Sequence, residues 1–240
     1  MKIGRWILFF IVIILFIFIF LFIFNKDLFT VKKIKVISDV KINNADFFKK
    51  INVKKGYYIW QYDIESIKRN VDRLFIFDSV KVSKKFPDLI QIELKMRVPL
   101  GRVVGKGGVP YLLDKRGVVY SSSRVGGNIP LLIVDTSNEV LPGRKLTGRY
   151  TEIIQFLWIM KNKYDIYYSS ISQIEIENSN NQFSYHFNFR TINKTITLKK
   201  NLNVENIIDA FSIAYFSDWS NSGYAEVSII DKGVFYKREE

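Results

Sequence analysis

The sequence predicts an α+β protein that carries one N-terminal transmembrane helix, and three observations support this class. Residues 6–24 form an unbroken apolar run, and residues 31–98 show the order strand, helix, helix, strand, strand. After Pro99, short apolar runs alternate with turns, and two helical patterns interrupt them. We therefore expect a membrane anchor, a small domain with two helices on one face of a sheet, and a mixed, β-rich domain with two helices.

The expected anchor, residues 6–24, contains only Ile, Leu, Phe and Val after Trp6. A helix of this length reaches about 28 Å, close to the roughly 30 Å thickness of the bilayer hydrocarbon. A buried core helix would show a polar face, which this segment lacks. A cleavable signal is usually shorter and ends in small residues, which are absent from residues 22–26. We therefore expect an uncleaved signal anchor.

The number of positive charges on each side of the anchor does not determine its orientation in the membrane. Lys2 and Arg5 precede it, and four lysines follow it, namely Lys26, Lys32, Lys33 and Lys35. The charged N-terminal region resembles that of an export signal, and long following domains cross the membrane largely regardless of their charge. We therefore expect residues 1–5 to form a cytoplasmic tail and the bulk of the chain to lie outside the cytoplasmic membrane.

The composition excludes several classes of function. The formal net charge is +13, but the basic residues are scattered and form no run of five or more, so we expect no nucleic-acid binding. A basic exterior beside anionic lipid explains this charge more simply. The chain has no cysteine, which excludes disulfides, thiolate catalysis and zinc sites built from cysteine.

The first domain is expected over residues 31–99, after a linker at residues 25–30. Alternating residues predict a strand at 31–37. Asn43 or Asn44 is placed to cap a helix whose apolar stripe is Phe47, Phe48 and Ile51. A second helix is expected from about Asp63, because apolar residues recur there at helical spacing. These residues are Ile64, Ile67, Val71 and Leu74.

Two strands close this domain, at residues 79–84 and 89–98, around a Pro-Asp turn. The second strand alternates most regularly, so one face is expected to be buried and the other wet. The residues of the buried face are Ile90, Ile92, Leu94, Met96 and Val98.

The second domain is expected over residues 100–240. Residues 149–164 are predicted to form a helix with Ile153, Leu157, Met160 and Tyr164 on one side. Strands are predicted at 171–177, 182–190 and 195–198, followed by a helix from Asn203. A strand at 224–230, a turn at 231–233 and a short strand at 234–236 close the chain.

No set of residues predicts catalysis. Ser38 and Lys41 form a Ser-x-x-Lys pattern typical of penicillin-binding enzymes, but the accompanying motifs are absent, so we interpret it as chance. His186 is the sole histidine and falls on the polar side of a strand, where exposure to solvent is more common than metal binding or base catalysis. We expect no catalytic residue, no metal, no cofactor and no small-molecule substrate.

The order of these pieces resembles the FtsQ/DivIB family of bacterial division proteins, which carry an anchor, a polypeptide-transport-associated (POTRA) domain and a β domain. Three local patterns carry the resemblance. The family's first POTRA strand is similar to Phe29, Val31, Ile34 and Val36. Its Glu-Arg-x-Pro junction is similar to Met96, Arg97, Val98 and Pro99. Its Tyr-Leu-hydrophobic-Asp turn with a following glycine is similar to Tyr111, Leu112, Leu113, Asp114 and Gly117.

The resemblance implies a non-catalytic, single-pass scaffold in the inner membrane at the division septum. Its implied partners are FtsB (DivIC)-like and FtsL-like bitopic proteins, through which it would link early and late division proteins and regulate septal peptidoglycan synthesis. The alternative is another envelope, secretion or assembly adaptor that carries a POTRA domain.

The closing strands are the expected partner-binding site. A strand at the end of a chain often lies at a sheet edge, where unpaired backbone groups accept a strand from another protein. Ala225, Val227 and Ile229 are expected to face the core. The alternative is that residues 224–236 simply complete the sheet, or that the short strand at 234–236 covers it. The candidate partner-binding residues are Glu226, Ser228, Ile230, Asp231, Lys232, Gly233, Val234 and Tyr236.

Overall fold

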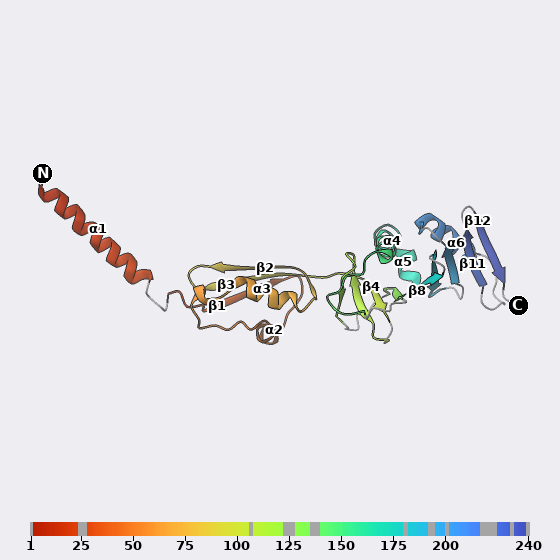
Figure 1. Ribbon diagram of the computed structural model, residues 1–240, viewed down its shortest axis with the longest axis horizontal. Coiled ribbons are helices and arrows are strands. Elements are labelled where there is room, and N and C mark those ends of the chain that lie inside the picture. Colours follow the sequence, from red (N-terminus) through yellow and green to blue (C-terminus); the bar gives the residue numbers. More distant parts are fainter. Residues whose placement is uncertain are drawn as a thin grey trace. The chain divides into compact units, whose positions relative to one another are not determined.

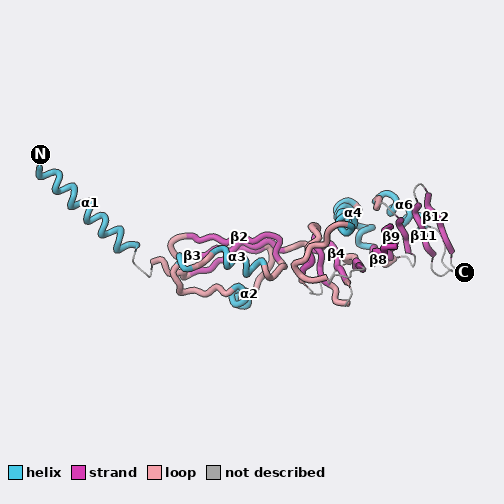
Figure 2. Tube along the Cα trace, in the orientation of Figure 1, coloured by secondary structure: helices cyan, strands magenta, loops and turns pink. Residues whose placement is uncertain are grey.

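The computed structural model describes residues 2–23, 28–105, 108–121, 128–134, 140–179, 182–191, 195–199, 202–216, 225–230 and 233–238 (Figures 1 and 2). Beyond Ile213 it describes the backbone alone. The chain divides into two compact units, Met1–Met96 and Arg97–Glu240.

The first helix, α1 (Lys2–Ile23), contains the apolar run. Its side chains from Trp6 to Phe22 are all exposed, by 37% at Ile13 to 74% at Phe16. Within the described residues, no helix combines the length and hydropathy that are required of a membrane span. The expected span over residues 6–24 is therefore not confirmed, and Phe24 lies outside the described residues.

The rest of the first unit has the predicted order of strand, helix, helix, strand, strand. Its elements are β1 (Lys33–Ser38), α2 (Asn44–Ile51), a 3₁₀ turn η1 (Ile59–Gln61), α3 (Ile64–Asp72), β2 (Phe77–Lys85) and β3 (Leu89–Met96). The sheet order is β1-β3-β2, in which β1 runs parallel to β3 and β2 antiparallel to it.

Both helices begin at the residues that the sequence predicted. The side chain of Asn43 accepts a hydrogen bond from the amide of Ala45, and that of Asp63 accepts one from the amide of Glu65. These contacts satisfy amides that have no partner within the helix, which is why a short polar side chain favours this position.

The buried face of β3 follows the predicted alternation as far as the strand extends. Ile90, Ile92 and Leu94 are buried in one core with Phe47 and other residues of α2, α3 and β2. Val98, which was expected on this face, is 63% exposed. That expectation was wrong because β3 ends at Met96, so the alternation no longer applies two residues later.

The second unit contains a nine-stranded mixed sheet and three described helices. Its strands are β4 (Pro99–Val104), β5 (Tyr111–Asp114), β6 (Val119–Tyr120), β7 (Leu131–Val134), β8 (Ile171–Ser179), β9 (Gln182–Phe189), β10 (Thr195–Lys199), β11 (Ala225–Ile230) and β12 (Gly233–Arg238). Its helices are α4 (Arg149–Lys163), α5 (Asp165–Ser170) and α6 (Val204–Phe216). The sheet order is β12-β11-β10-β9-β8-β7-β4-β5-β6.

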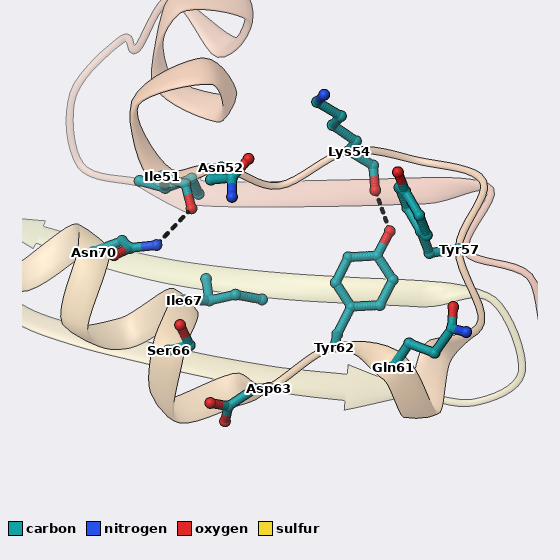
Figure 3. A pocket seen from close by; sticks show the side chains of 10 residues that line it. All are labelled: Ile51, Asn52, Lys54, Tyr57, Gln61, Tyr62, Asp63, Ser66, Ile67 and Asn70. Carbon is teal, nitrogen blue, oxygen red and sulfur yellow. Dashed lines mark hydrogen bonds between the residues drawn. The ribbon is translucent and has the colours of Figure 1, made fainter.

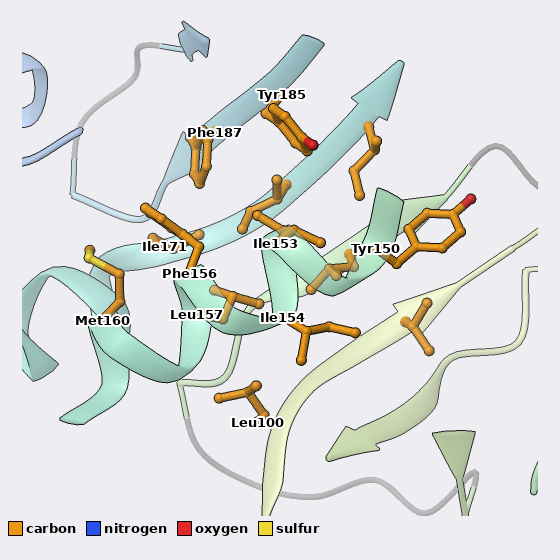
Figure 4. Close-up of a cluster of buried hydrophobic side chains, with 14 of the residues drawn as sticks. Leu100, Tyr150, Ile153, Ile154, Phe156, Leu157, Met160, Ile171, Tyr185 and Phe187 are labelled. Atoms are coloured by element: carbon orange, nitrogen blue, oxygen red, sulfur yellow. The ribbon is translucent and has the colours of Figure 1, made fainter. Parts of the chain in front are cut away.

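Helix α4 supplies the centre of this unit's core (Figure 4). Ile153, Leu157 and Met160 are fully buried on the predicted side of the helix, and Tyr164 packs against the same core. The rings of Phe156 and Phe187 meet edge to face at 5.4 Å between centroids, which joins α4 to β9.

The sequence predicted two helices in this unit, whereas the described part also contains α5. Tyr164 separates α5 from α4 with a non-helical backbone (φ −138°, ψ 51°). A helix of six residues is too short to show a periodic apolar pattern, so it could not be predicted from the sequence.

Candidate functional site

The described sheet of the second unit has two edge strands, β12 and β6. Strand β12 pairs with β11 on one side, antiparallel, from Ile230 opposite Gly233 to Ala225 opposite Arg238. Its other side has no neighbouring strand in the described sheet. Figure 1 shows β12 as the outermost strand, in blue, close to the C-terminus.

The strand at residues 224–230 was expected at the edge, and this expectation was wrong. Strand β11 lies inside the sheet, because β10 pairs with it in parallel on one side and β12 covers its other side. The alternative, a closing hairpin that covers this strand, describes the observed order. The sequence could not decide between the two, because pairing with the distant β10 has no local signal.

The candidate residues are thus divided between an inner and an outer strand. Glu226, Ser228 and Ile230 lie in β11, opposite Lys237, Phe235 and Gly233 respectively. Gly233, Val234 and Tyr236 lie in the edge strand β12 itself. Asp231 and Lys232 lie outside the described residues.

The register assigns each position of this hairpin to a face of the sheet. Val227 lies opposite Ile196, and Ile229 lies opposite Leu198, both of which are buried in the core that α4 and α6 cover. Val227 and Ile229 therefore share the core face, because directly paired residues lie on the same side of a sheet. Tyr236 and Val234, their partners in β12, share this face as well.

The opposite face of the sheet is polar near this hairpin. His186 Nδ1 lies 2.9 Å from Thr197 Oγ1, and its Nε2 lies 3.2 Å from Ser184 Oγ and 3.4 Å from Glu177. The side chain of His186 is only 23% exposed, so it is more enclosed than the sequence suggested. These contacts orient the imidazole as part of a hydrogen-bonded network between β8, β9 and β10.

The two catalytic patterns considered from the sequence do not form a site. Ser38 ends β1, and its Oγ accepts a hydrogen bond from the amide of Val40 at 3.3 Å. The adjacent Asp39 accepts a bond from the amide of Met96. Among the described residues, no three His, Asp or Glu side chains lie close enough to hold a metal ion.

A buried ion pair organises the start of the second unit. Arg97 donates from Nη1 to Asp114 Oδ2 at 2.5 Å, with the side chains 13% and 4% exposed. Asp114 Oδ1 accepts from the amides of Arg116 and Val118 at 2.9 and 2.8 Å. Gly117 completes this turn with φ +80°, a conformation that favours glycine.

The arrangement at β12 is suited to binding a strand from another protein. An edge strand offers backbone donors and acceptors at a fixed spacing, so an extended segment can add to the sheet through main-chain hydrogen bonds.

Comparison with known protein families identifies the folded domain of the first unit. Residues 29–97 match the family model of the FtsQ-type POTRA domain. This range contains β1, α2, α3, β2 and β3, which is the strand, helix, helix, strand, strand unit described above. No curated protein matches the chain.

Proposed function

We propose that this chain is a member of the FtsQ/DivIB family and a non-catalytic scaffold of the bacterial division machinery, which its FtsQ-type POTRA domain supports. The observation that carries the proposal is the matched domain followed by a second sheet unit with an open edge strand. Such a protein acts through contacts with other proteins, by linking early and late division proteins and regulating septal peptidoglycan synthesis.

The proposal includes a single-pass anchor in the inner membrane. Two features of α1 support it. The helix has 22 residues with no acidic residue in its first turn and no basic residue in its last. Its exposed side chains from Trp6 to Phe22 are all large and apolar, a surface that is unfavourable in water and favourable in lipid. The N-terminal tail then lies in the cytoplasm and both folded units lie outside it.

We assign the partner-binding surface to the edge strand β12. The partners of this proposal are FtsB (DivIC)-like and FtsL-like bitopic division proteins, whose extended segments would pair with the free side of β12. Main-chain pairing depends little on side chains, so it is compatible with any sequence at Val234 and Tyr236 that keeps the strand extended.

A second candidate function is that of another envelope, secretion or assembly adaptor. POTRA domains serve in such proteins, and the matched domain alone does not separate the two functions. The cellular location does separate them, because a division protein gathers at the septum and an assembly adaptor is spread over the envelope.

The experiment is a fluorescent fusion to the N-terminus, produced at its native level and imaged in dividing cells. We expect a band at midcell that depends on the FtsB-like and FtsL-like partners. An even distribution around the envelope, from a fusion that supports growth, would favour the adaptor.

A further inference from the structure

Three aromatic rings, Phe29, Trp60 and Phe86, pack in a row with tilted planes on the surface of the first unit, and we call this row the stack. Trp60 lies 4.6 Å from Phe29 and 5.9 Å from Phe86, between ring centroids. Trp60 is 51% exposed and Phe86 is 58% exposed. Large aromatic rings with this exposure are costly in water, so a stack of them marks a surface that contacts something else.

The stack lies at one end of the small sheet. Phe86 belongs to the β2–β3 turn, and the register pairs Leu89, after this turn, with Lys33 at the start of β1. The other end of the same sheet holds Ser38, opposite Leu94. The stack is therefore at the end where the chain enters this domain from α1.

The segment that carries Trp60 is held in a fixed shape by several contacts. The amide of Ile59 donates to Phe29 O at 2.9 Å, and Lys84 Nζ donates to Trp60 O at 3.4 Å. Tyr62 donates from its hydroxyl to Lys54 O, across an open hollow of about 330 Å³ (Figure 3). These contacts fix the backbone of the segment that carries the exposed Trp60 side chain.

The charge around the stack is strongly positive. The three segments that form this end of the domain, residues 31–33, 54–62 and 84–88, contain six lysines and one acidic residue, Asp88. The lysines are Lys32, Lys33, Lys54, Lys55, Lys84 and Lys85. The nearby Asp63 forms an ion pair with Arg69 at 3.3 Å, which reduces its effect on the lysines. The surface therefore complements an anionic partner.

The chain itself limits how far this surface can lie from the end of α1. Phe29 follows Ile23, the last residue of α1, by six residues. Six residues span at most about 21 Å when fully extended. If α1 is the membrane anchor proposed above, the stack cannot lie further than this from the point where the chain leaves the bilayer.

From these observations we propose that the end of the POTRA domain formed by Phe29, Trp60 and Phe86 binds the surface of an anionic lipid bilayer. The aromatic rings enter the headgroup region and the surrounding lysines contact lipid phosphates. Trp suits this position because its ring is apolar while its N–H needs a polar partner, which is the environment of the membrane interface. Lysines extend toward anionic headgroups while their stems lie along apolar surface.

This inference rests on the proposed anchor and adds a second contact to it. A bilayer explains the combination of exposed rings and lysines better than a protein partner, because the chain holds this surface beside the membrane in every molecule. The contact would fix the POTRA domain against the membrane instead of leaving it free on its linker.

The experiment uses the full chain in vesicles of phosphatidylethanolamine and phosphatidylglycerol. Because the chain has no cysteine, Lys85→Cys and Lys41→Cys each give one site for a nitroxide label. Lys85 precedes Phe86, and Lys41 follows the opposite end of β1. Collisions of the label with oxygen, which concentrates in lipid, and with a water-soluble nickel complex report its depth. We expect position 85 to be shielded from nickel and position 41 to be open to it.

Two matched variants test which side chains cause the shielding. Trp60→Ser with Phe86→Ser should raise nickel access at position 85 to the value at position 41. Ile37→Ser with Val40→Ser removes two apolar side chains, each 42% exposed, from the opposite end and should leave the shielding unchanged. Vesicles of neutral phosphatidylcholine should weaken the shielding, and equal shielding there would overturn the role of the lysines. Circular dichroism checks that each variant is folded.

The possible failures can be told apart by flotation of the vesicles. If the chain floats with them and position 85 is as open to nickel as position 41, the lipid-binding surface is wrong and a protein partner for the stack becomes the better explanation. If the chain does not float, α1 is not an anchor, and the proposed membrane function fails with it.

Discussion

Arg97 and Asp114 form an ion pair of 2.5 Å that is almost fully withdrawn from solvent. The two residues belong to separate local patterns of the sequence, and the structure brings them together where β4 begins and β5 ends. Asp114 also accepts hydrogen bonds from two backbone amides of its own turn. One carboxylate therefore holds Arg97, the first residue of the second unit, and the β5–β6 turn together.

Asp114→Asn is expected to destabilise the second unit by about 3–5 kcal/mol, because removing one member of a buried pair leaves the other charge uncompensated. Arg97 keeps some contact with water, so the lower end of this range applies. Urea unfolding of the full chain in mild detergent measures the change. The matched control is Arg69→Gln, whose pair with Asp63 is 61% and 62% exposed and should contribute less than about 1 kcal/mol. Equal effects of the two variants would contradict the assigned role of the buried pair.

Gly117→Ala is expected to destabilise the same turn by more than about 1 kcal/mol. The backbone of Gly117 has φ +80°, and a Cβ there would lie 2.7 Å from Leu146 O. Gly56→Ala is the control, since Gly56 has φ +93° but no atom within 4 Å of the added Cβ. Thermal unfolding should show a larger loss for Gly117→Ala than for the control. A loss no larger than that of Gly56→Ala would mean that Leu146 moves away without cost.

The stability of the second unit should fall as the pH rises above about 10. Burial raises the pKa of Tyr168 and Tyr120 above their ordinary value of 10.0, so the unfolded chain loses these protons first. Each tyrosine then lowers the free energy of unfolding by up to about 1.4 kcal/mol per pH unit. Burial lowers the pKa of Lys161, so this group raises the free energy of unfolding as the pH rises toward 10.5. The two tyrosines outweigh this single lysine.

The variant Tyr168→Phe separates these contributions. Its hydroxyl donates to Leu100 O at 2.6 Å, so the variant should lose about 1–3 kcal/mol at neutral pH. It should also show a shallower fall above pH 10, since one titrating group is gone. Unfolding free energies measured from pH 8 to 11 test both. An unchanged slope in the variant would mean that Tyr168 does not cause the alkaline loss.

Ser38→Ala and His186→Ala are both expected to leave growth and division intact. Ser38 makes one exposed contact with the amide of Val40, and its loss should cost under about 0.5 kcal/mol. His186→Ala removes contacts with Thr197 and Ser184 and should cost about 0.5–1.5 kcal/mol. Complementation with immunoblotting for protein level measures the outcome. Loss of division at a normal protein level would indicate that the side chain performs chemistry.

Local sequence patterns predicted most elements of both units because the forces that form them are local. Asn43 and Asp63 cap their helices, and the alternation of β3 fixes its buried face, whatever the rest of the chain does. The position of β11 inside the sheet depends on its pairing with β10, which lies some thirty residues earlier in the chain. No local sequence pattern indicates such a distant pairing. The stack of Phe29, Trp60 and Phe86 joins three distant segments and was missed for the same reason.

The proposed site on β12 can be tested through the direction in which its backbone amides point. Pairs in an antiparallel hairpin alternate, starting from the pair Ile230 and Gly233 that closes it, so the amide of Tyr236 is expected to point away from β11. Proline at this position removes that donor and places its ring at the open edge, while the hairpin keeps its own bonds. Tyr236→Ala keeps the amide and changes only the side chain, so it is the matched control.

The most direct test is the affinity of the full chain in detergent for the FtsB-like and FtsL-like partners, with circular dichroism of each variant. We predict that Tyr236→Pro stays folded and loses at least about tenfold in affinity, which corresponds to about 1.4 kcal/mol, while Tyr236→Ala loses clearly less. A folded Tyr236→Pro protein that binds these partners with unchanged affinity would contradict the assignment of β12 as the docking strand.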